Sequence, residues 1–319
     1  MIESEMLFPE IVGQEQAKKK LAFFHRGYRA TNIIPHLMFI APKGCGKTML
    51  AKAMGKKLNR REDDKPKTFL ELNCSTIKNV KQFFNQVVIP HISQKECTIL
   101  FDEASELPKD VTMALLTMLN PNETNRNEFS FEDYVVDLDF RNHSFIFATT
   151  EAHKIFHALM DRCERIDLEE YTYGHLGTIV GRQMQDVTFE KGMLEDVASV
   201  LRGNARAAQK MAGNLKTYLA SKMSKRFTKN DWETVKNELG ILPLGVNRIE
   251  LQILRALKEK KDCSLTHLGA VTGLTTQCIR QDFELFLQKT RLIDISTNGR
   301  SLTAKGHKYL KELKQTSIK

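Results

Sequence analysis

The sequence predicts an α/β protein in which a parallel sheet with covering helices is followed by a smaller helical domain and a C-terminal winged helix. Three observations support this prediction. Continuous apolar runs alternate with helical patterns up to about residue 168, helical periodicity alone continues over 173–239, and a pattern of three helices and a hairpin follows. A chain of 319 residues suits two or three domains. We expect domains at residues 1–170, 171–242 and 243–319.

Five apolar runs predict the strands of the sheet. Each run is bounded by polar or turn-forming residues, and its apolarity is continuous rather than alternating. Continuous apolarity is typical of parallel strands, because helices cover both faces of such a sheet. The runs lie at residues 37–40, 68–72, 98–101, 144–148 and 165–168.

The pattern changes after the fifth run. Apolar residues recur at helical spacing, as in Leu194, Val197 and Leu201, and they predict a small all-helical second domain. Pro243 and Gly245 then interrupt regular structure, so they indicate a linker before the last domain.

The last segment has the pattern of a winged helix. Ser264 is a good N-cap for the second of its helices, and Thr275 or Thr276 begins the third. The dipeptide Asn298-Gly299 predicts a hairpin, because a type I′ turn needs positive φ at both central residues. Three helices followed by a hairpin describe a winged helix.

Positive charge is concentrated in the same segment. The net charge is +9, and the residues from 247 onward hold 14 Lys and Arg against 7 Asp and Glu. A compact basic region is the usual footprint of a nucleic-acid contact, although a solubilising surface would have the same composition. As contacts to double-stranded or branched DNA we expect Arg280, on the polar side of the third helix, and Arg300, at the tip of the wing.

Residues 36–48 run from an apolar strand into a phosphate-binding loop. The pattern G-x-x-x-x-G-K-[ST] is met except at its first position, where Ala41 replaces glycine. The glycines let backbone amides approach a triphosphate, and Lys47 reaches the β- and γ-phosphates while the Thr48 hydroxyl binds magnesium. The pattern predicts ATP and Mg²⁺ as cofactors. The residues expected to bind them in this loop and the first helical turn are Pro42, Lys43, Gly44, Cys45, Gly46, Lys47, Thr48 and Met49.

Polar residues follow two further apolar strands. Asp102 would hold the magnesium through a water molecule, and Glu103 would orient and deprotonate the attacking water. Thr150, which ends a later strand, would touch the γ-phosphate or that water. Each of these residues has a structural alternative, because acids and threonines at strand ends also cap the helices that follow them.

Composition favours a cytoplasmic protein. A hydrophobic fraction of 41% and a charged fraction of 27% are typical of soluble globular proteins. No apolar run is long enough to span a membrane, and the acidic residues 1–5 do not resemble a signal peptide. The six cysteines are scattered without metal-ligand spacing, so we expect reduced and mostly buried thiols.

Five motifs occur in a fixed order, and together with the winged helix they resemble those of AAA+ ATPases. The similarity is closest to the RuvB family, the Holliday-junction branch-migration motors, and it covers essentially the whole chain. The motifs are Ala41-Pro-Lys-Gly-Cys-Gly-Lys-Thr48, Phe101-Asp-Glu103, Ala148-Thr-Thr150, Leu159-Met-Asp-Arg162 and Gly203-Asn-Ala-Arg206.

The resemblance implies further site residues. Arg162 would be an arginine finger that enters the neighbouring subunit's site, which requires a homo-oligomeric ring that we expect to be hexameric. Arg206 would be a second sensor that reports the γ-phosphate to the lid. Ile11 and Val12 would flank the adenine, and Tyr171 would lie beside the nucleotide where the chain passes into the lid. From residue chemistry alone, Arg162 and Arg206 remain open to surface ion pairing and solvation.

The stretch 121–139 reads as a hairpin inserted before the fourth strand. In the RuvB family a hairpin here docks the junction-binding partner protein RuvA. This chain has a hairpin at the same position, but the amino-acid sequence of its hairpin has little in common with that of the family. Two other departures from the family pattern are Ala41 and Met160, the latter standing where the family usually has an arginine.

Two alternative functions remain open at this point. Clamp-loader ATPases place Ser-Arg-Cys at the finger, which Asp161-Arg-Cys163 resembles, but the serine is missing and clamp loaders end in a helical collar. A replication initiator would join the same ATPase core to a winged helix and use ATP as a slow switch. A motor would differ from such a switch by DNA-stimulated turnover.

Overall fold

The computed structural model describes residues 6–316, with side chains as far as residue 313. Residues 1–5, whose composition argues against a signal peptide, lie outside the described residues. The chain divides into two compact units, Met1–Phe227 and Thr228–Lys319. The three-domain division with boundaries after residues 170 and 242 stays a prediction.

A five-stranded sheet forms the centre of the first unit. All of its neighbouring strands are parallel, in the order β2-β3-β6-β1-β7. Every predicted strand is confirmed to within one residue at each end. The strands are β1 (Leu37–Ile40), β2 (Thr68–Asn73), β3 (Cys97–Asp102), β6 (His143–Thr149) and β7 (Glu164–Asp167).

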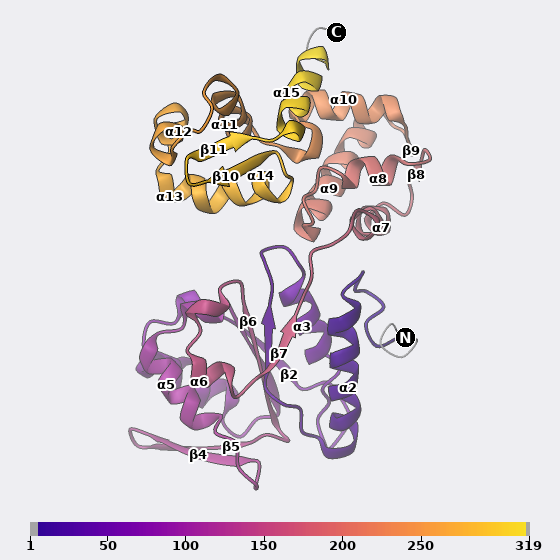
Figure 1. Cartoon of the computed structure of the whole chain (residues 1–319). Helices are drawn as coiled ribbons and strands as arrows, with labels where there is room; N and C mark the ends of the chain where they lie inside the picture. The colour runs from indigo at the N-terminus through magenta and orange to yellow at the C-terminus, as the bar shows by residue number, and fades with distance from the viewer. Residues whose placement is uncertain (1–5, 317–319) are drawn as a thin grey trace. The chain divides into compact units, whose positions relative to one another are not determined.

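Helices cover both faces of this sheet, as continuous apolarity in the strands requires. Helices α2 and α3 lie on one face, and α5 and α6 lie on the other (Figure 1). The helices are α2 (Glu15–Thr31), α3 (Lys47–Gly55), α4 (Val80–Phe83), the π-helix η2 (Phe84–Ile92), α5 (Lys109–Met118) and α6 (His157–Met160). Short 3₁₀ turns are η1 (Cys74–Thr76), η3 (Ala104–Glu106) and η4 (Ala152–Lys154).

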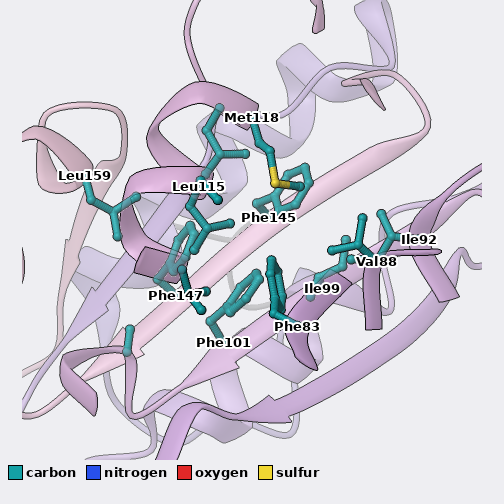
Figure 2. Close-up of a cluster of buried hydrophobic side chains, with 14 of the residues drawn as sticks. Phe83, Val88, Ile92, Ile99, Phe101, Leu115, Met118, Phe145, Phe147 and Leu159 are labelled. Carbon is teal, nitrogen blue, oxygen red and sulfur yellow. The ribbon is translucent and has the colours of Figure 1, made fainter. Parts of the chain in front are cut away.

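Aromatic residues fill the core on the α5 side (Figure 2). Phe101 of β3 and Phe147 of β6 are register partners, and their rings stack with centroids 4.9 Å apart. Phe83 packs against Phe101 at 6.0 Å. This packing fixes β3 against β6 just below the ends of both strands, where the predicted site residues Asp102 and Thr150 lie.

The hairpin predicted within 121–139 is confirmed. Strands β4 (Arg126–Phe131) and β5 (Tyr134–Asp139) pair antiparallel. Phe129 and Phe131 stack on Phe84 with centroids 5.0 and 4.3 Å away, whereas Tyr134 and Val135 are 49% and 66% exposed. The hairpin therefore packs against η2 through β4, while the start of β5 is exposed to solvent.

The lid segment is mainly helical, as predicted. It contains α7 (Tyr173–Gln183), α8 (Met193–Ala198) and α9 (Ala205–Ser221). The prediction that it is all helical is wrong in one detail, because β8 (Thr188–Phe189) and β9 (Arg226–Phe227) form a short parallel pair. Two residues per strand leave too little periodicity for a sequence pattern to detect.

The second unit contains the predicted winged helix. Asn247 and Ser264 cap its first two helices, and Thr275 is the N-cap of the third. Its elements are α10 (Lys229–Leu239), η5 (Pro243–Gly245), α11 (Arg248–Glu259), α12 (Leu265–Thr272), α13 (Thr276–Cys278), η6 (Ile279–Glu284), α14 (Leu285–Lys289), β10 (Ile293–Ser296), β11 (Gly299–Leu302) and α15 (Ala304–Thr316).

The predicted turn of the wing is wrong in register. Ser296 pairs with Gly299, so Thr297 and Asn298 form the turn. Neither has positive φ, and the turn is therefore not type I′. Gly299 lies in the strand, where a Cβ would come 2.8 Å from the carbonyl oxygen of Cys263. Close backbone approach, rather than turn geometry, explains this glycine.

The structure bears on the predictions about the cysteines and about membrane-spanning segments. All six cysteines are free, and four of them are buried. Burial raises the pKa of the Cys97 and Cys163 thiols to about 12, which disfavours reactive thiolates. Among the described residues, none of the helices combines the length and apolarity that crossing a bilayer would need.

His36, just before β1, is buried among aromatic rings. The rings of Phe140 and Phe145 lie edge-on at 4.9 and 5.5 Å. The Nδ1 atom of His36 has no hydrogen-bond partner among the described residues. Burial lowers the pKa of this imidazole to about 4, because a charged ring would be desolvated.

We expect this histidine to make folding stability depend on pH. The unfolded chain takes up a proton near pH ~6.5 and the folded chain only near pH 4, so stability falls as the pH falls through this window. The loss amounts to about 3 kcal/mol. His36→Phe should flatten urea-unfolding free energies between pH 7 and 4.5, whereas exposed His91→Ala should not. An unchanged slope in His36→Phe would contradict this assignment.

Candidate nucleotide site

The carboxyl ends of β1, β3 and β6 meet at one edge of the sheet. Ligands of open parallel sheets bind at this edge. A cavity of about 490 Å³ lies there between the sheet and the lid segment. Its lining includes Ile11, Val12, Lys43, Gly44, Gly46, Lys47, Thr48, Met49, Asp102, Glu103, Thr150, Tyr171 and Arg206. The structure therefore brings together thirteen of the predicted site residues.

The phosphate-binding loop holds both of its glycines in left-handed backbone conformations. Gly44 and Gly46 have φ values of 82° and 92°, a region that side-chain-bearing residues rarely adopt. Lys47 begins α3, and its Nζ donates to the carbonyl oxygens of Ala41 at 2.7 Å and Pro42 at 3.2 Å. Burial lowers the pKa of the Lys47 ammonium, and the Glu103 carboxylate opposes that shift. The free amides at the start of α3 and the Lys47 charge would attract a triphosphate.

Thr48 and Asp102 form the candidate magnesium site. The Thr48 hydroxyl donates to Asp102 Oδ2 at 3.0 Å, so both oxygens lie close enough to share one ion. The described residues contain no cluster of three or more metal-ligating side chains. This donor set fits Mg²⁺, which usually keeps several waters and binds through one or two protein oxygens plus substrate phosphates.

Glu103 is held in an unusual backbone conformation. Its φ and ψ are 54° and 50°, in the left-handed region that costs a residue with a side chain about 1 kcal/mol or more. Its amide donates to Asp102 Oδ1 at 3.1 Å. The strain is located at the residue predicted to act on the attacking water. The helix-capping alternative is not supported, because Glu103 makes no side-chain cap to η3.

Thr150 lines the cavity, while its neighbour Thr149 makes the local structural contact. Thr149 Oγ1 accepts a hydrogen bond from the amide of Glu151 at 3.0 Å. The N-cap of η4 is Glu151 and makes no side-chain cap bond, so the capping alternative for Thr150 is not supported. The Thr150 side chain is left facing the cavity.

The lid segment closes directly on the phosphate-binding loop. Asn204 is the N-cap of α9, and its Nδ2 donates to the carbonyl oxygen of Lys43 at 3.3 Å. The amide of Ala205 donates to the carbonyl oxygen of Gly44 at 2.9 Å. These contacts bring Arg206, the next residue of α9, to the cavity wall.

Gln14 and Tyr171 tie the entry segment to the lid. Gln14 Nε2 donates to the carbonyl oxygens of Cys45 and Glu169, at 3.3 and 2.7 Å, and its Oε1 accepts from the Glu169 amide. The Tyr171 hydroxyl lies 2.8 Å from where a Cβ on Gly46 would be. Residues of the entry segment and of the start of the lid therefore both lie against the phosphate-binding loop.

Two predicted contacts are not supported by the lining. Pro42 and Cys45 do not reach the cavity, because the Cys45 side chain is buried and the Pro42 carbonyl faces Lys47. Six further residues of the entry segment and the lid line the cavity but were not predicted as site residues, although Ala205 lies within the motif Gly203-Asn-Ala-Arg206. These are Glu10, Ile179, Arg182, Gln183, Ala205 and Gln209.

Arg162 does not line the cavity of its own chain. It follows α6, and its Nη1 donates to the carbonyl oxygen of Ala158 at 2.8 Å. Its Nη2 donates to Asn120 Oδ1 at 3.0 Å. It forms no ion pair with Asp161 or Glu164 among the described contacts, so the surface ion-pair alternative is not supported.

The side chains of the two residues predicted to contact DNA differ in how far they are exposed to solvent. Arg280 is exposed on the third helix of the winged helix. Arg300 is not at the tip of the wing, and that prediction is wrong. It lies in β11, where its Nε donates to Glu284 Oε1 at 2.5 Å, and its side chain is only 15% exposed. Its guanidinium is thus bound within the protein.

Comparisons with known proteins cover the whole chain. A family model described as the ATPase family associated with various cellular activities (AAA) matches residues 37–171, and one described as the RuvB C-terminal winged helix domain matches residues 243–311. The Holliday junction branch migration complex subunit RuvB of Mycoplasmopsis pulmonis is 26% identical and aligns with 96% of each chain. The chain is thus similar to RuvB proteins along nearly its whole length.

Further RuvB proteins show the same similarity. The RuvB subunit of Thermotoga maritima is 23% identical, over 95% of this chain and 90% of its own length. A solved structure described as the T. maritima RuvB Holliday junction branch migration motor has a TM-score of 0.74 at 20% identity, over 94% of this chain and 95% of that one. This similarity confirms an AAA+ fold with a helical lid and a winged helix.

The departure of this RuvB-like chain at Ala41 leaves the loop's backbone contacts intact. Ala41 is buried, its amide donates to Thr149, and its carbonyl accepts from Lys47. Both contacts use backbone atoms, so a methyl group in place of hydrogen does not remove them.

We expect Gly44→Ala to weaken ATP binding about tenfold or more, a loss of about 1.4 kcal/mol. A Cβ at this position would lie 2.0 Å from Asn204 Oδ1, and the left-handed φ adds strain. Titration with a fluorescent ATP analogue measures the effect. Gly213→Ala, on α9 with open space around its Cβ position, is the matched control and should bind normally. Wild-type affinity in Gly44→Ala would show that the lid need not pack on the loop.

Proposed function

We propose that this chain is an ATP-hydrolysing, ring-forming motor that drives branch migration of Holliday junctions. The observation that carries the proposal is the cavity in which the Thr48–Asp102 contact, Glu103 and the lid residue Arg206 meet. The similarity to RuvB proteins and the winged-helix unit support DNA as the substrate. The relatives that align over nearly their whole length are named as subunits of a Holliday junction branch migration complex.

Each residue has a distinct role in this proposal. Lys47 and the amides of the loop bind the phosphates, and Thr48 and Asp102 hold Mg²⁺, which neutralises phosphate charge when bound. Glu103 orients and deprotonates the attacking water, with Thr150 beside it. Arg206 reports the γ-phosphate to the lid through its position on α9.

The arginine finger is proposed to act between subunits. Arg162 lies outside its own chain's cavity, as a residue that completes a neighbour's site would. A finger in trans requires a ring, which we propose to be a hexamer in the cytoplasm. The hairpin with exposed Tyr134 and Val135 is the proposed docking surface for a junction-binding partner of the RuvA type.

The two alternative functions receive less support. A clamp loader would end in a helical collar, whereas the C-terminal unit here is a winged helix of the RuvB type. An initiator-like switch shares the winged helix, but the relatives that align along the whole chain are branch migration subunits.

Arg162→Ala tests the proposed function. We expect it to reduce junction-stimulated ATP turnover by on the order of 10³-fold or more while ATP still binds. The measurement is ATPase activity with a synthetic four-way junction, together with conversion of that junction into duplex products and electron microscopy of the assemblies. A monomer with full turnover, or an Arg162→Ala variant with normal branch migration, would exclude the proposal.

Arg280→Ala should weaken DNA binding about equally for unrelated sequences and reduce the slope of log affinity against log salt by about 1. Arg300→Ala should instead destabilise the winged helix by about 3 kcal/mol, because it leaves the buried Glu284 carboxylate unpaired. Salt-dependent fluorescence anisotropy and urea unfolding distinguish the two effects. Sequence-selective loss in Arg280→Ala would argue for an initiator.

A further inference from the structure

The side chain of Arg162 is held by its own chain in a way that leaves it usable. A guanidinium has five N–H donors. Two of them are engaged, one with the carbonyl oxygen of Ala158 and one with Asn120 Oδ1. The Nε atom is buried and has no partner among the described residues. The guanidinium is therefore oriented by one hydrogen bond from Nη1 and one from Nη2, and each of these nitrogens keeps a second N–H that can bind a phosphoryl group.

Asn120 is itself fixed from the other side by the hairpin. Its carbonyl oxygen accepts from Asn127 Nδ2 at 2.7 Å, and the same Asn127 nitrogen donates to the carbonyl oxygen of Met118 at 2.9 Å. Met118 is the last residue of α5, so Asn127 satisfies a carbonyl that a helix end leaves free. Asn127 lies in β4, the first strand of the hairpin.

Asn122 completes this connection. Its Nδ2 donates to Asn127 Oδ1 and to the carbonyl oxygen of Arg126 at 2.6 Å. The turn between α5 and β4 is thus fixed by asparagine side chains, and one of its residues holds the finger. None of these residues lines the nucleotide cavity of the chain.

We propose that Asn120 is a positioning residue for the arginine finger and that Asn127 anchors it to the base of the hairpin. The proposal rests on the function of Arg162 in trans. Asn120 sets the direction of the Arg162 guanidinium, and Asn127 sets the position of Asn120. The hairpin base and the finger then move as one body, so a load on the hairpin reaches the neighbouring site through two hydrogen-bonded side chains.

Asn120→Ala should lower kcat for ATP about 10-fold to 100-fold, as misplacement of a catalytic group by about 1 Å does. KM for ATP should not change, because the finger acts in the transition state and Asn120 lies outside the binding cavity. The variant should fold, since the exposed Asn120 keeps its backbone contact with Asn127. Glu123→Ala, in the same turn, is the control and should match wild type. Asn127→Ala should lower kcat in the same direction.

Mixed assemblies separate positioning in trans from a general structural effect. The Asn120→Ala subunit has an intact nucleotide site but a misplaced arginine finger. The Glu103→Gln subunit has an intact arginine finger but an inactive nucleotide site. Mixing the full-length variants with junction DNA should give more turnover than the sum of the two alone. No gain, or a higher turnover in Asn120→Ala by itself, would overturn the inference.

A parallel mixture of Arg162→Ala with Glu103→Gln tests the finger itself. Gain in that mixture without gain in the Asn120→Ala mixture would exclude the positioning role and leave the proposed function standing. Full turnover of Arg162→Ala alone would instead exclude the proposed function.

Discussion

The contact between Thr48 and Asp102 is the constraint on which the nucleotide site depends. The two residues come from α3 and from the end of β3, and β6 separates β3 from the strand that precedes α3. Their oxygens meet only if all three strands keep their register. The stacked Phe101 and Phe147 rings maintain that register between β3 and β6 immediately below the site. Hydrophobic packing thus places the polar atoms.

The same edge of the sheet explains how a lid can respond to nucleotide. The lid touches the loop through one backbone hydrogen bond, from the Ala205 amide to the Gly44 carbonyl, and through the Asn204 side chain, which lies against the Gly44 Cα. Such contacts have little room to adapt, because interiors are close-packed and the glycine leaves no gap. In the proposed function, a shift of the loop on nucleotide binding would be passed through these contacts to the start of α9, where Arg206 lies.

Most of the fold and the centre of the site could be predicted from sequence, because they rest on local signals. Apolar runs placed the strands, and the loop pattern placed Lys47 and Thr48. Gln183 and Gln209 could not be found, since they reach the cavity only through packing of the lid. Arg300 was misassigned for a related reason. Its partner Glu284 is 16 residues away, and neither residue's pattern shows that the two pair.

The Arg300–Glu284 pair changes what the wing can do. A guanidinium bound to a carboxylate that is only 6% exposed has little charge to offer a phosphate, so the wing arginine joins β11 to the third helix instead. The backbone bonds between Arg300 and Cys263 hold the same strand from its other edge. The wing is therefore held at both edges, and the exposed Arg280 on the third helix stays the residue proposed to contact the DNA backbone.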